Sequence, residues 1–250
     1  MGTTFNSIEP LHYYTKHYQM RNYVIIGGSS GIGKELVNLL ENHGANVLAT
    51  YNKNAIEDRQ NVKYIQFDAV KDTLPLDDLP EEIHGLAYCP GSINLKPFHR
   101  FTEEEYINDF RLQVLGATKV IQQLLPRIKK SKDSSILLFS TVAVQSGFSF
   151  HSQVAISKGA IEGLTRSLAA ELSPTIRVNA IAPSLTNTNL ASPFLNTPEK
   201  VNLQSEKNPL RRIGNAIDIA EASVYLLTQK SSWVTGQILH VDGGFSNIKQ

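Results

Sequence analysis

Hydrophobic and polar positions follow two different rhythms along the chain. Short runs rich in apolar residues predict β-strands at residues 23–26, 47–51, 62–67, 85–89, 135–139, 176–181 and 237–241. Between these runs, apolar residues recur at helical spacing and predict helices over residues 32–43, 103–130, 152–172 and 217–227. Residues 184–208 are polar and show little periodicity, so we expect a loop or lid there.

The order of these elements indicates the fold class. Strands that alternate with helices form parallel sheets with right-handed crossovers and helices on both faces. Runs such as 23–26 and 136–139 have no charged position, which is typical of strands covered on both sides. We predict one α/β domain over residues 21–250, a Rossmann-type doubly wound parallel sheet in three α/β/α layers. Ligands bind such sheets at the carboxyl ends of the strands, which are marked here by Gly27, Tyr51, Asp68, Gly91, Ser140 and Pro183.

Composition and charge narrow the class of partner. The 250 residues carry a formal net charge of +1, so we expect neither nucleic acid nor a membrane as a partner. No run of 18 apolar residues predicts a membrane span, and no metal site is predicted. The single cysteine, Cys89, cannot form an internal disulfide and favours a cytoplasmic location. Residues 1–20 are interpreted as an N-terminal extension that is disordered or foreign to the natural protein.

The first predicted strand runs directly into a glycine-rich turn, Gly-Gly-Ser-Ser-Gly-Ile-Gly at residues 27–33. Glycine lets the backbone turn tightly and approach a phosphate, and the helix that follows offers free N–H groups to it. A tight turn without a ligand could have the same composition, so the motif alone leaves that alternative open. The cofactor-binding interpretation assigns this role to Gly27, Ser29, Ser30, Gly31, Ile32 and Gly33.

The spacing G-x-x-x-G-x-G resembles that of the short-chain dehydrogenase/reductase family. Other segments between about residues 21 and 246 are similar to the family as well: Asp68-Ala69, residues 179–184 (Asn-Ala-Ile-Ala-Pro-Ser), 209–214, 234–237 and 241–244. The resemblance implies that Asp68 and Ala69 contact the adenine and that Thr188 contacts the nicotinamide amide. It also implies cofactor contacts for Pro90, Gly91, Pro183 and Ser184, the last of which replaces a family glycine.

The choice of cofactor depends on the end of the second predicted strand. An acidic residue there would bind the ribose hydroxyl of NAD and repel the 2′-phosphate of NADP. This chain has Tyr51-Asn52-Lys53 and no acid, so we predict that NADP(H) is preferred over NAD(H). Lys53 could pair with the phosphate, or it could be a solvated loop lysine.

The resemblance also locates a catalytic site, where this chain departs from the family. Active members carry a tyrosine four residues before a lysine, which places both on one helical face. The lysine is present as Lys158, but Val154 occupies the tyrosine position and Thr141 the position of the supporting serine. Gln113 corresponds to the family's asparagine. Because valine cannot transfer a proton, ordinary carbonyl reduction should be weakened ~10²–10⁴-fold.

Three side chains near this site have alternative interpretations. His151 lies seven residues before Lys158, where enoyl reductases of this fold carry their tyrosine, so it is either a proton donor or an ordinary polar residue at a helix start. Cys89 lies in the Tyr88-Cys89-Pro90-Gly91 segment, which replaces the family's N-N-A-G, and it either faces the cofactor or is buried and inert. Gln113 either holds a water or Lys158, or fills space.

Two functional hypotheses follow. The first is an NADP(H)-dependent oxidoreductase that reduces an activated C=C or a carbonyl of a small molecule. For the C=C bond, Thr141 and Lys158 polarise the conjugated carbonyl and the α-carbon takes its proton from water; in a variant of this hypothesis His151 donates the proton. The second is a dinucleotide-binding sensor or structural protein without turnover. The family resemblance implies a homodimer or homotetramer, with which the apolar stripes over residues 103–130 and 152–172 are compatible.

Overall fold

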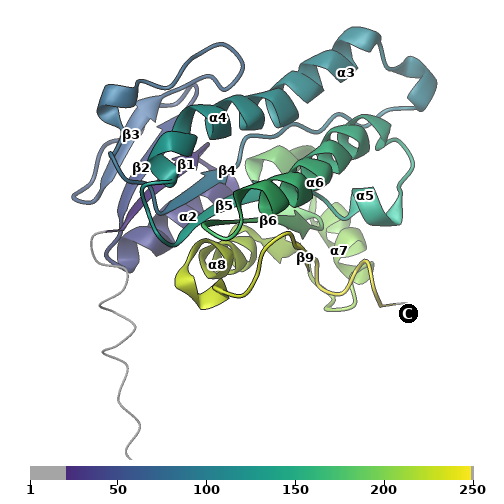
Figure 1. The fold of residues 1–250 in the computed structure, drawn as a ribbon. Helices are drawn as coiled ribbons and strands as arrows, with labels where there is room; N and C mark the ends of the chain where they lie inside the picture. Colours follow the sequence, from purple (N-terminus) through teal and green to yellow (C-terminus); the bar gives the residue numbers. More distant parts are fainter. Residues whose placement is uncertain (1–20, 249–250) are drawn as a thin grey trace, which may run out of the picture.

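The computed structural model describes residues 21–248, and a parallel β-sheet lies at its centre (Figure 1). The sheet has seven strands in the order β3-β2-β1-β4-β5-β6-β9, and every neighbouring pair is parallel. Their bounds are β1 (Asn22–Ile26), β2 (Asn46–Tyr51), β3 (Val62–Gln66), β4 (Gly85–Tyr88), β5 (Ser134–Phe139), β6 (Ile176–Pro183) and β9 (Ile238–Val241). The predicted doubly wound sheet is confirmed. The extension expected at residues 1–20 lies outside the described residues.

Helices cover both faces of this sheet. One face packs against α4 (Gly116–Ile128) and α6 (Ser152–Leu172), and the other against α2 (Gly31–Asn42) and α8 (Ala216–Leu227). The shorter elements are η1 (Leu76–Asp78), η2 (Phe98–Arg100), α3 (Glu103–Phe110), η3 (Arg111–Leu115), α5 (Ala143–Ser146), β7 (Thr186–Asn187), η4 (Asn189–Phe194), α7 (Pro198–Glu206), β8 (Gly214–Asn215) and η5 (Gln229–Ser231). The arrangement confirms the three predicted layers. Within residues 21–248, no helix has the length and apolarity needed to cross a bilayer.

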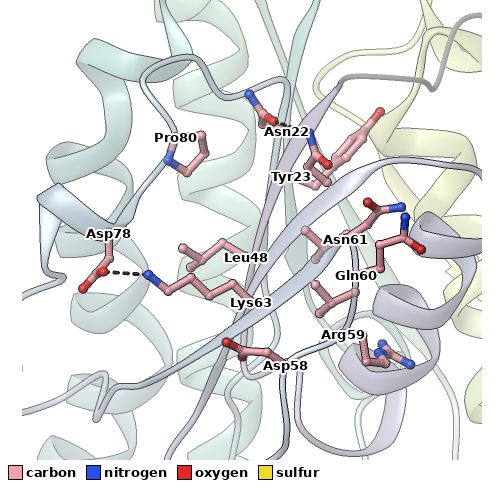
Figure 2. A pocket seen from close by; sticks show the side chains of 13 residues that line it. Asn22, Tyr23, Leu48, Asp58, Arg59, Gln60, Asn61, Lys63, Asp78 and Pro80 are labelled. Carbon is pink, nitrogen blue, oxygen red and sulfur yellow. Dashed lines mark hydrogen bonds and ion pairs between the residues drawn. The ribbon is translucent and has the colours of Figure 1, made fainter.

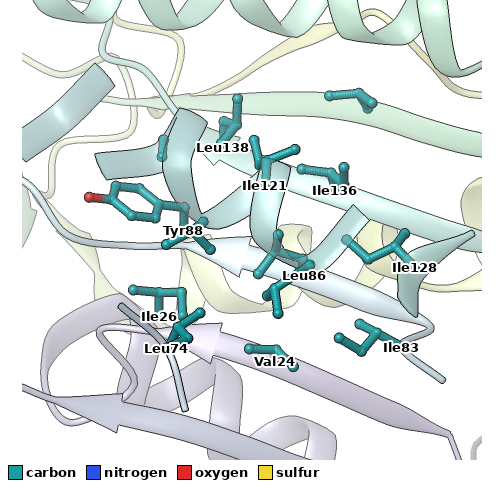
Figure 3. Packing of buried hydrophobic residues seen from close by; sticks show 14 of the residues in the cluster. Val24, Ile26, Leu74, Ile83, Leu86, Tyr88, Ile121, Ile128, Ile136 and Leu138 are labelled. Carbon is teal, nitrogen blue, oxygen red and sulfur yellow. The ribbon is translucent and has the colours of Figure 1, made fainter. Parts of the chain in front are cut away.

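Burial on both faces explains the apolar strands. On one face, Leu86 of β4 and Leu138 of β5 lie in a single cluster with Ile121 and Ile128 of α4 (Figure 3). On the opposite face, residues such as Leu137 pack with α2 and α8. Since every residue of β5 is buried, its hydrophobicity cannot alternate as it does in a half-exposed strand.

The order of the strands creates the crevice in which the candidate site lies. Strands β2 and β3 follow β1 on one side, whereas β5, β6 and β9 follow β4 on the other. The direction of winding therefore reverses between β1 and β4, and loops at their carboxyl ends move apart there. The glycine-rich turn follows β1, and Pro90 and Gly91 follow β4.

The structure differs from the prediction in two segments. The helix expected over residues 103–130 is interrupted by η3, a π-helical turn that separates α3 from α4. The segment 184–208, expected to be a loop, contains β7, η4 and α7. Thr197 is the N-cap residue of α7, and its hydroxyl accepts a hydrogen bond from Lys200 N. Pro198 is the first residue of the helix. This Thr-Pro start is an N-terminal helix signal that the weak periodicity of the segment obscured.

Candidate active site

A cavity of about 710 Å³ opens at the crevice between β1 and β4. This volume falls within the range typical of small-molecule sites, about 300–1,000 Å³. Its walls come from the glycine-rich turn, the ends of β4, β5 and β6, helix α6 and the segment from β7 to α7. Most of the segments to which the sequence assigned a chemical role therefore meet at one site.

The glycine-rich turn has a backbone that only glycine permits. Gly27 and Gly31 have φ values of +76° and +52°, in the left-handed region that disfavours a Cβ. A Cβ on Gly33 would lie 2.3 Å from the Gly27 carbonyl oxygen, so helix and strand could not approach as closely. Thr50 Oγ1 at the end of β2 accepts a hydrogen bond from Gly27 N at 2.9 Å and fixes the start of the turn.

The start of helix α2 remains available to a ligand. Its N-cap residue Ser30 makes no side-chain capping hydrogen bond, so the first N–H groups of the helix are left without one. Such a helix start offers N–H donors and a partial positive charge to a phosphate. A nicotinamide dinucleotide, whose pyrophosphate needs such donors, fits this cradle.

Most of the predicted cofactor residues line the cavity, and three do not. Those on the cavity are Gly27, Ser29, Ser30, Gly31, Ile32, Gly33, Asn52, Ala69, Pro90, Gly91, Lys158, Pro183, Ser184 and Thr188. The three that do not line it are Tyr51, Lys53 and Asp68. The Lys53 side chain is exposed, as expected for a solvated loop lysine. The Asp68 carboxylate is directed back to its own turn, where it accepts a hydrogen bond from Val70 N at 2.9 Å.

Every residue predicted to act in catalysis borders the cavity. Thr141 follows β5, Gln113 lies in η3, and Val154 and Lys158 lie one turn apart on α6. Val154 is only 5% exposed, so its isopropyl group is packed into the wall. His151 is the N-cap residue of α6, and its Nδ1 lies 2.8 Å from the carbonyl oxygen of Ser149.

Lys158 is the buried cation of this site. Burial lowers the pKa of its ammonium group to about 8, against the opposing effects of Asp109 and Cys89. Within residues 21–248, no side chain or carbonyl makes a hydrogen bond to its Nζ. The amine can therefore serve a ligand in the cavity.

The remaining titratable groups nearby are unsuited to proton transfer. Burial raises the pKa of the Cys89 thiol to about 12, so this cysteine is neutral at physiological pH, although the residue lines the cavity. Tyr88 is unsuited as well, because its hydroxyl donates to the carbonyl of Leu112 and burial raises its pKa. Its side chain is part of the core rather than of the cavity wall.

Several lining residues were not anticipated from the sequence. An aromatic wall is formed by Phe148 and Phe245, whose ring centroids lie 5.6 Å apart, and by Phe194 of η4. Asn208, after α7, is 3% exposed and has an Oδ1 without a hydrogen-bond partner. These residues come from loops far apart in the sequence, and nothing in the local pattern indicates that they meet.

A buried acid next to the cavity was also missed. Asp109, in the last turn of α3, is 5% exposed and accepts hydrogen bonds from Ser92, Gln113 and Ser157. The available signal was a carboxylate four residues before Gln113, among the apolar positions of an amphipathic helix. A charged residue on such a face must find buried partners.

A second hollow, of about 350 Å³, lies at the opposite, amino-terminal ends of β1, β2 and β3 (Figure 2). Its charged side chains are paired with one another or with neighbours. Lys63 binds Asp78 at 2.7 Å, and Arg59 binds Glu41 at 3.1 Å. It contains neither the glycine turn nor Lys158, so we place the functional site in the larger cavity.

Comparisons with known proteins cover nearly the whole described chain. A model of the family described as enoyl-(acyl carrier protein) reductase matches residues 27–246. A tropinone reductase homolog of Arabidopsis thaliana is 30% identical over 241 residues, which cover 89% of this chain and 91% of that protein. L-xylulose reductase of Bos taurus is 29% identical over 235 residues, which cover 90% and 96% of the two chains.

Solved structures share the same architecture. A short chain dehydrogenase family protein from Francisella tularensis superposes with a TM-score of 0.82 at 26% identity, covering 92% of this chain and 100% of that one. ElxO with NADP bound superposes with a TM-score of 0.79, covering 91% and 99% of the chains. Because ElxO is only 20% identical to this chain, the superposition shows a shared fold and nothing further.

Proposed function

We propose that this chain, which belongs to the short-chain dehydrogenase/reductase family, is an NADP(H)-dependent oxidoreductase that reduces an activated C=C bond in a small molecule. One observation carries the proposal: Lys158 and Thr141 line the same cavity as the glycine turn, whereas Val154 lines it at the tyrosine position. On this proposal, Lys158 and Thr141 polarise a substrate oxygen beside the bound cofactor, and Val154 stands where the family resemblance implies a proton donor. The description of the matched family as an enoyl reductase supports the same reaction class.

The chemistry of the retained groups favours a conjugated substrate. NADP(H), when bound, supplies the hydride. The Lys158 ammonium and the Thr141 hydroxyl donate hydrogen bonds to the substrate carbonyl and stabilise the negative charge that develops on its oxygen as hydride reaches the β-carbon. The α-carbon then takes its proton from water. A simple ketone would need a proton on oxygen at the moment of transfer, and Val154 cannot provide it.

The proposed preference for NADP(H) depends on the absence of an acid after β2. Asn52 lines the cavity at the position where a carboxylate would repel a 2′-phosphate. Lys53 does not line the cavity, so the preference does not depend on it. ElxO, which shares this fold, holds NADP, so the fold accommodates the larger cofactor.

A binding protein without turnover is the second candidate. The burial of Val154 favours this candidate, because valine cannot transfer a proton. The contact of His151 Nδ1 with the Ser149 carbonyl also favours it, because it occupies one ring nitrogen of the alternative proton donor. This candidate uses the same cofactor cradle. The two candidates therefore differ only in whether substrate reacts.

Two further properties complete the proposal. Ile107, Leu115 and Ile156 are exposed on α3, η3 and α6, where an apolar surface would suit a homodimer or homotetramer. We also propose a cytoplasmic location, which the single free cysteine, Cys89, supports.

The first experiment is calorimetric titration of the purified protein with NADPH and, separately, with NADH. We expect NADPH to bind more tightly. Binding of neither cofactor would refute both candidates. A panel of enones and of the matching saturated ketones then tests turnover, with Lys158→Ala as the comparison. Enone-dependent oxidation of NADPH that falls in Lys158→Ala supports the reductase, and binding without oxidation supports the second candidate.

A further inference from the structure

A buried carboxylate organises the polar side chains behind Lys158. Asp109 Oδ1 accepts hydrogen bonds from Ser92 Oγ and, at 2.8 Å, from Gln113 Nε2. Its Oδ2 accepts a hydrogen bond from Ser157 Oγ at 2.6 Å. These donors come from the loop after β4, from η3 and from α6, so one carboxylate joins three segments of the cavity wall. Asp109 itself does not line the cavity.

The carboxylate determines the orientation of the Gln113 amide. A glutamine side chain has a donor end and an acceptor end, and a carboxylate can only accept. Nε2 must therefore face Asp109, and Oε1 faces away from it. Gln113 is 1% exposed, and its Oε1 is a buried oxygen without a hydrogen-bond partner.

The Gln113 oxygen without a partner and the Lys158 amine both lie near Gly91. A Cβ built on Gly91 would be 3.5 Å from Gln113 Oε1 and 3.8 Å from Lys158 Nζ, so both atoms converge on the same side of Gly91. Gln113, Gly91 and Lys158 all line the cavity. An acceptor without a partner and a cationic donor thus lie near the same point behind Gly91.

We propose that Asp109 is a positioning residue of this site: it holds the Gln113 amide with its oxygen directed away from the carboxylate, on the side of Gly91 where the Lys158 amine lies, and thereby favours the charged form of that amine. The role of the pair in turnover rests on the proposed function. The positioning itself is a property of the protein without cofactor, so it can be tested even if neither NADPH nor an enone binds.

The other titratable groups around Lys158 are accounted for. Asp109 from α3 and Cys89 after β4 act on its charge, and the Cys89 thiol is neutral near pH 8. His151, before α6, contacts the Ser149 carbonyl. Glu162, further along α6, pairs with Arg166 at 3.2 Å and accepts from Ser140. Asp109 is therefore the carboxylate whose charge opposes the effect of burial on the Lys158 pKa.

The test measures the pKa of Lys158 by trace labelling with acetic anhydride across pH 6–11, read by mass spectrometry of its peptide. In Asp109→Asn we expect the Lys158 pKa to fall by about one unit or more, as typically follows loss of a nearby opposite charge. Glu104→Gln is the matched control, because it removes an exposed carboxylate from the same helix. An unchanged Lys158 pKa in Asp109→Asn, or an equal fall in both variants, overturns the proposal.

A second measurement uses the unaltered protein and decides the matter if Asp109→Asn does not fold. Nitrogen-15 NMR of the Gln113 side-chain amide reports solvent exchange of its two protons. We expect one Nε2 proton to exchange slowly, because it is bonded to a buried carboxylate. Rapid exchange of both protons would overturn the proposed orientation.

Discussion

Replacement of Lys158 by methionine should stabilise the protein in the absence of cofactor. Lys158 is 9% exposed, and its pKa falls from 10.5 in the unfolded chain to about 8 in the folded one. Between these values the unfolded state binds more protons, so the stability of the unaltered protein rises with pH over that window. Methionine has a similar length and no proton to lose, so its contribution is independent of pH.

The magnitude follows from the size of that shift. A difference of about 2.5 units at about 1.4 kcal/mol each corresponds to a cost of burying the charge on the order of 3 kcal/mol at pH 7. At pH 10 the unfolded lysine is itself partly neutral, and the cost is reduced to about 1 kcal/mol. Lys158→Met should therefore have its largest stability advantage near neutrality and lose about 2 kcal/mol of it by pH 10.

Urea unfolding of both proteins without cofactor, at pH 7 and pH 10, measures this difference. Any gain from packing the methionine is common to both pH values, so the change with pH isolates the charge. Lys53→Met, at an exposed lysine, is the control and should show no such dependence. A stability difference that is the same at pH 7 and pH 10 would refute the reasoning. Such a result would mean that Lys158 is solvated in the folded state.

Three other changes test separate parts of the site. Val154→Tyr places a phenol one helical turn from Lys158 and should raise the steady-state rate of ketone reduction ~10²–10⁴-fold. An unchanged rate would show that the site lacks a further catalytic group. Asn52→Asp should weaken NADPH binding about tenfold or more in calorimetry through repulsion of the 2′-phosphate; Asn54→Asp, off the cavity, is the control, and equal losses in both would contradict the argument. Gly33→Ala should abolish binding of both cofactors, because its Cβ would meet the Gly27 carbonyl oxygen at 2.3 Å; full affinity would contradict the close packing of helix and strand.

The sequence predicts the sheet well because burial on both faces leaves a strong signal in the strands. Segments such as β5 carry a continuous apolar run, here residues 136–139, and their order along the chain restricts the topology to few solutions. The glycine turn and the spacing of Val154 and Lys158 are local patterns, so their place on one cavity could be predicted as well.

Features that depend on long-range packing could not be predicted in this way. The contact of Phe148 with Phe245 joins residues almost a hundred positions apart, and neither has a local signature. The direction of Lys53 depends on how its loop leaves β2, and its exposed side chain does not line the cavity. The change of helical pitch at η3 leaves no mark in the periodicity of the sequence, and the partners of Asp109 come from three separate segments.

That change of pitch has a consequence for the comparison of related sequences. The π-helical turn η3 inserts one residue into a path that is otherwise α-helical, which rotates the preceding helix by about 100° relative to an uninterrupted one. A relative that lacks this residue would present a different edge of α3 to α6, even with an identical sequence elsewhere. Loss or gain of a single codon within residues 111–115 could thus remove Asp109 from its partners, or bring an acid to them, without altering the glycine turn or α6.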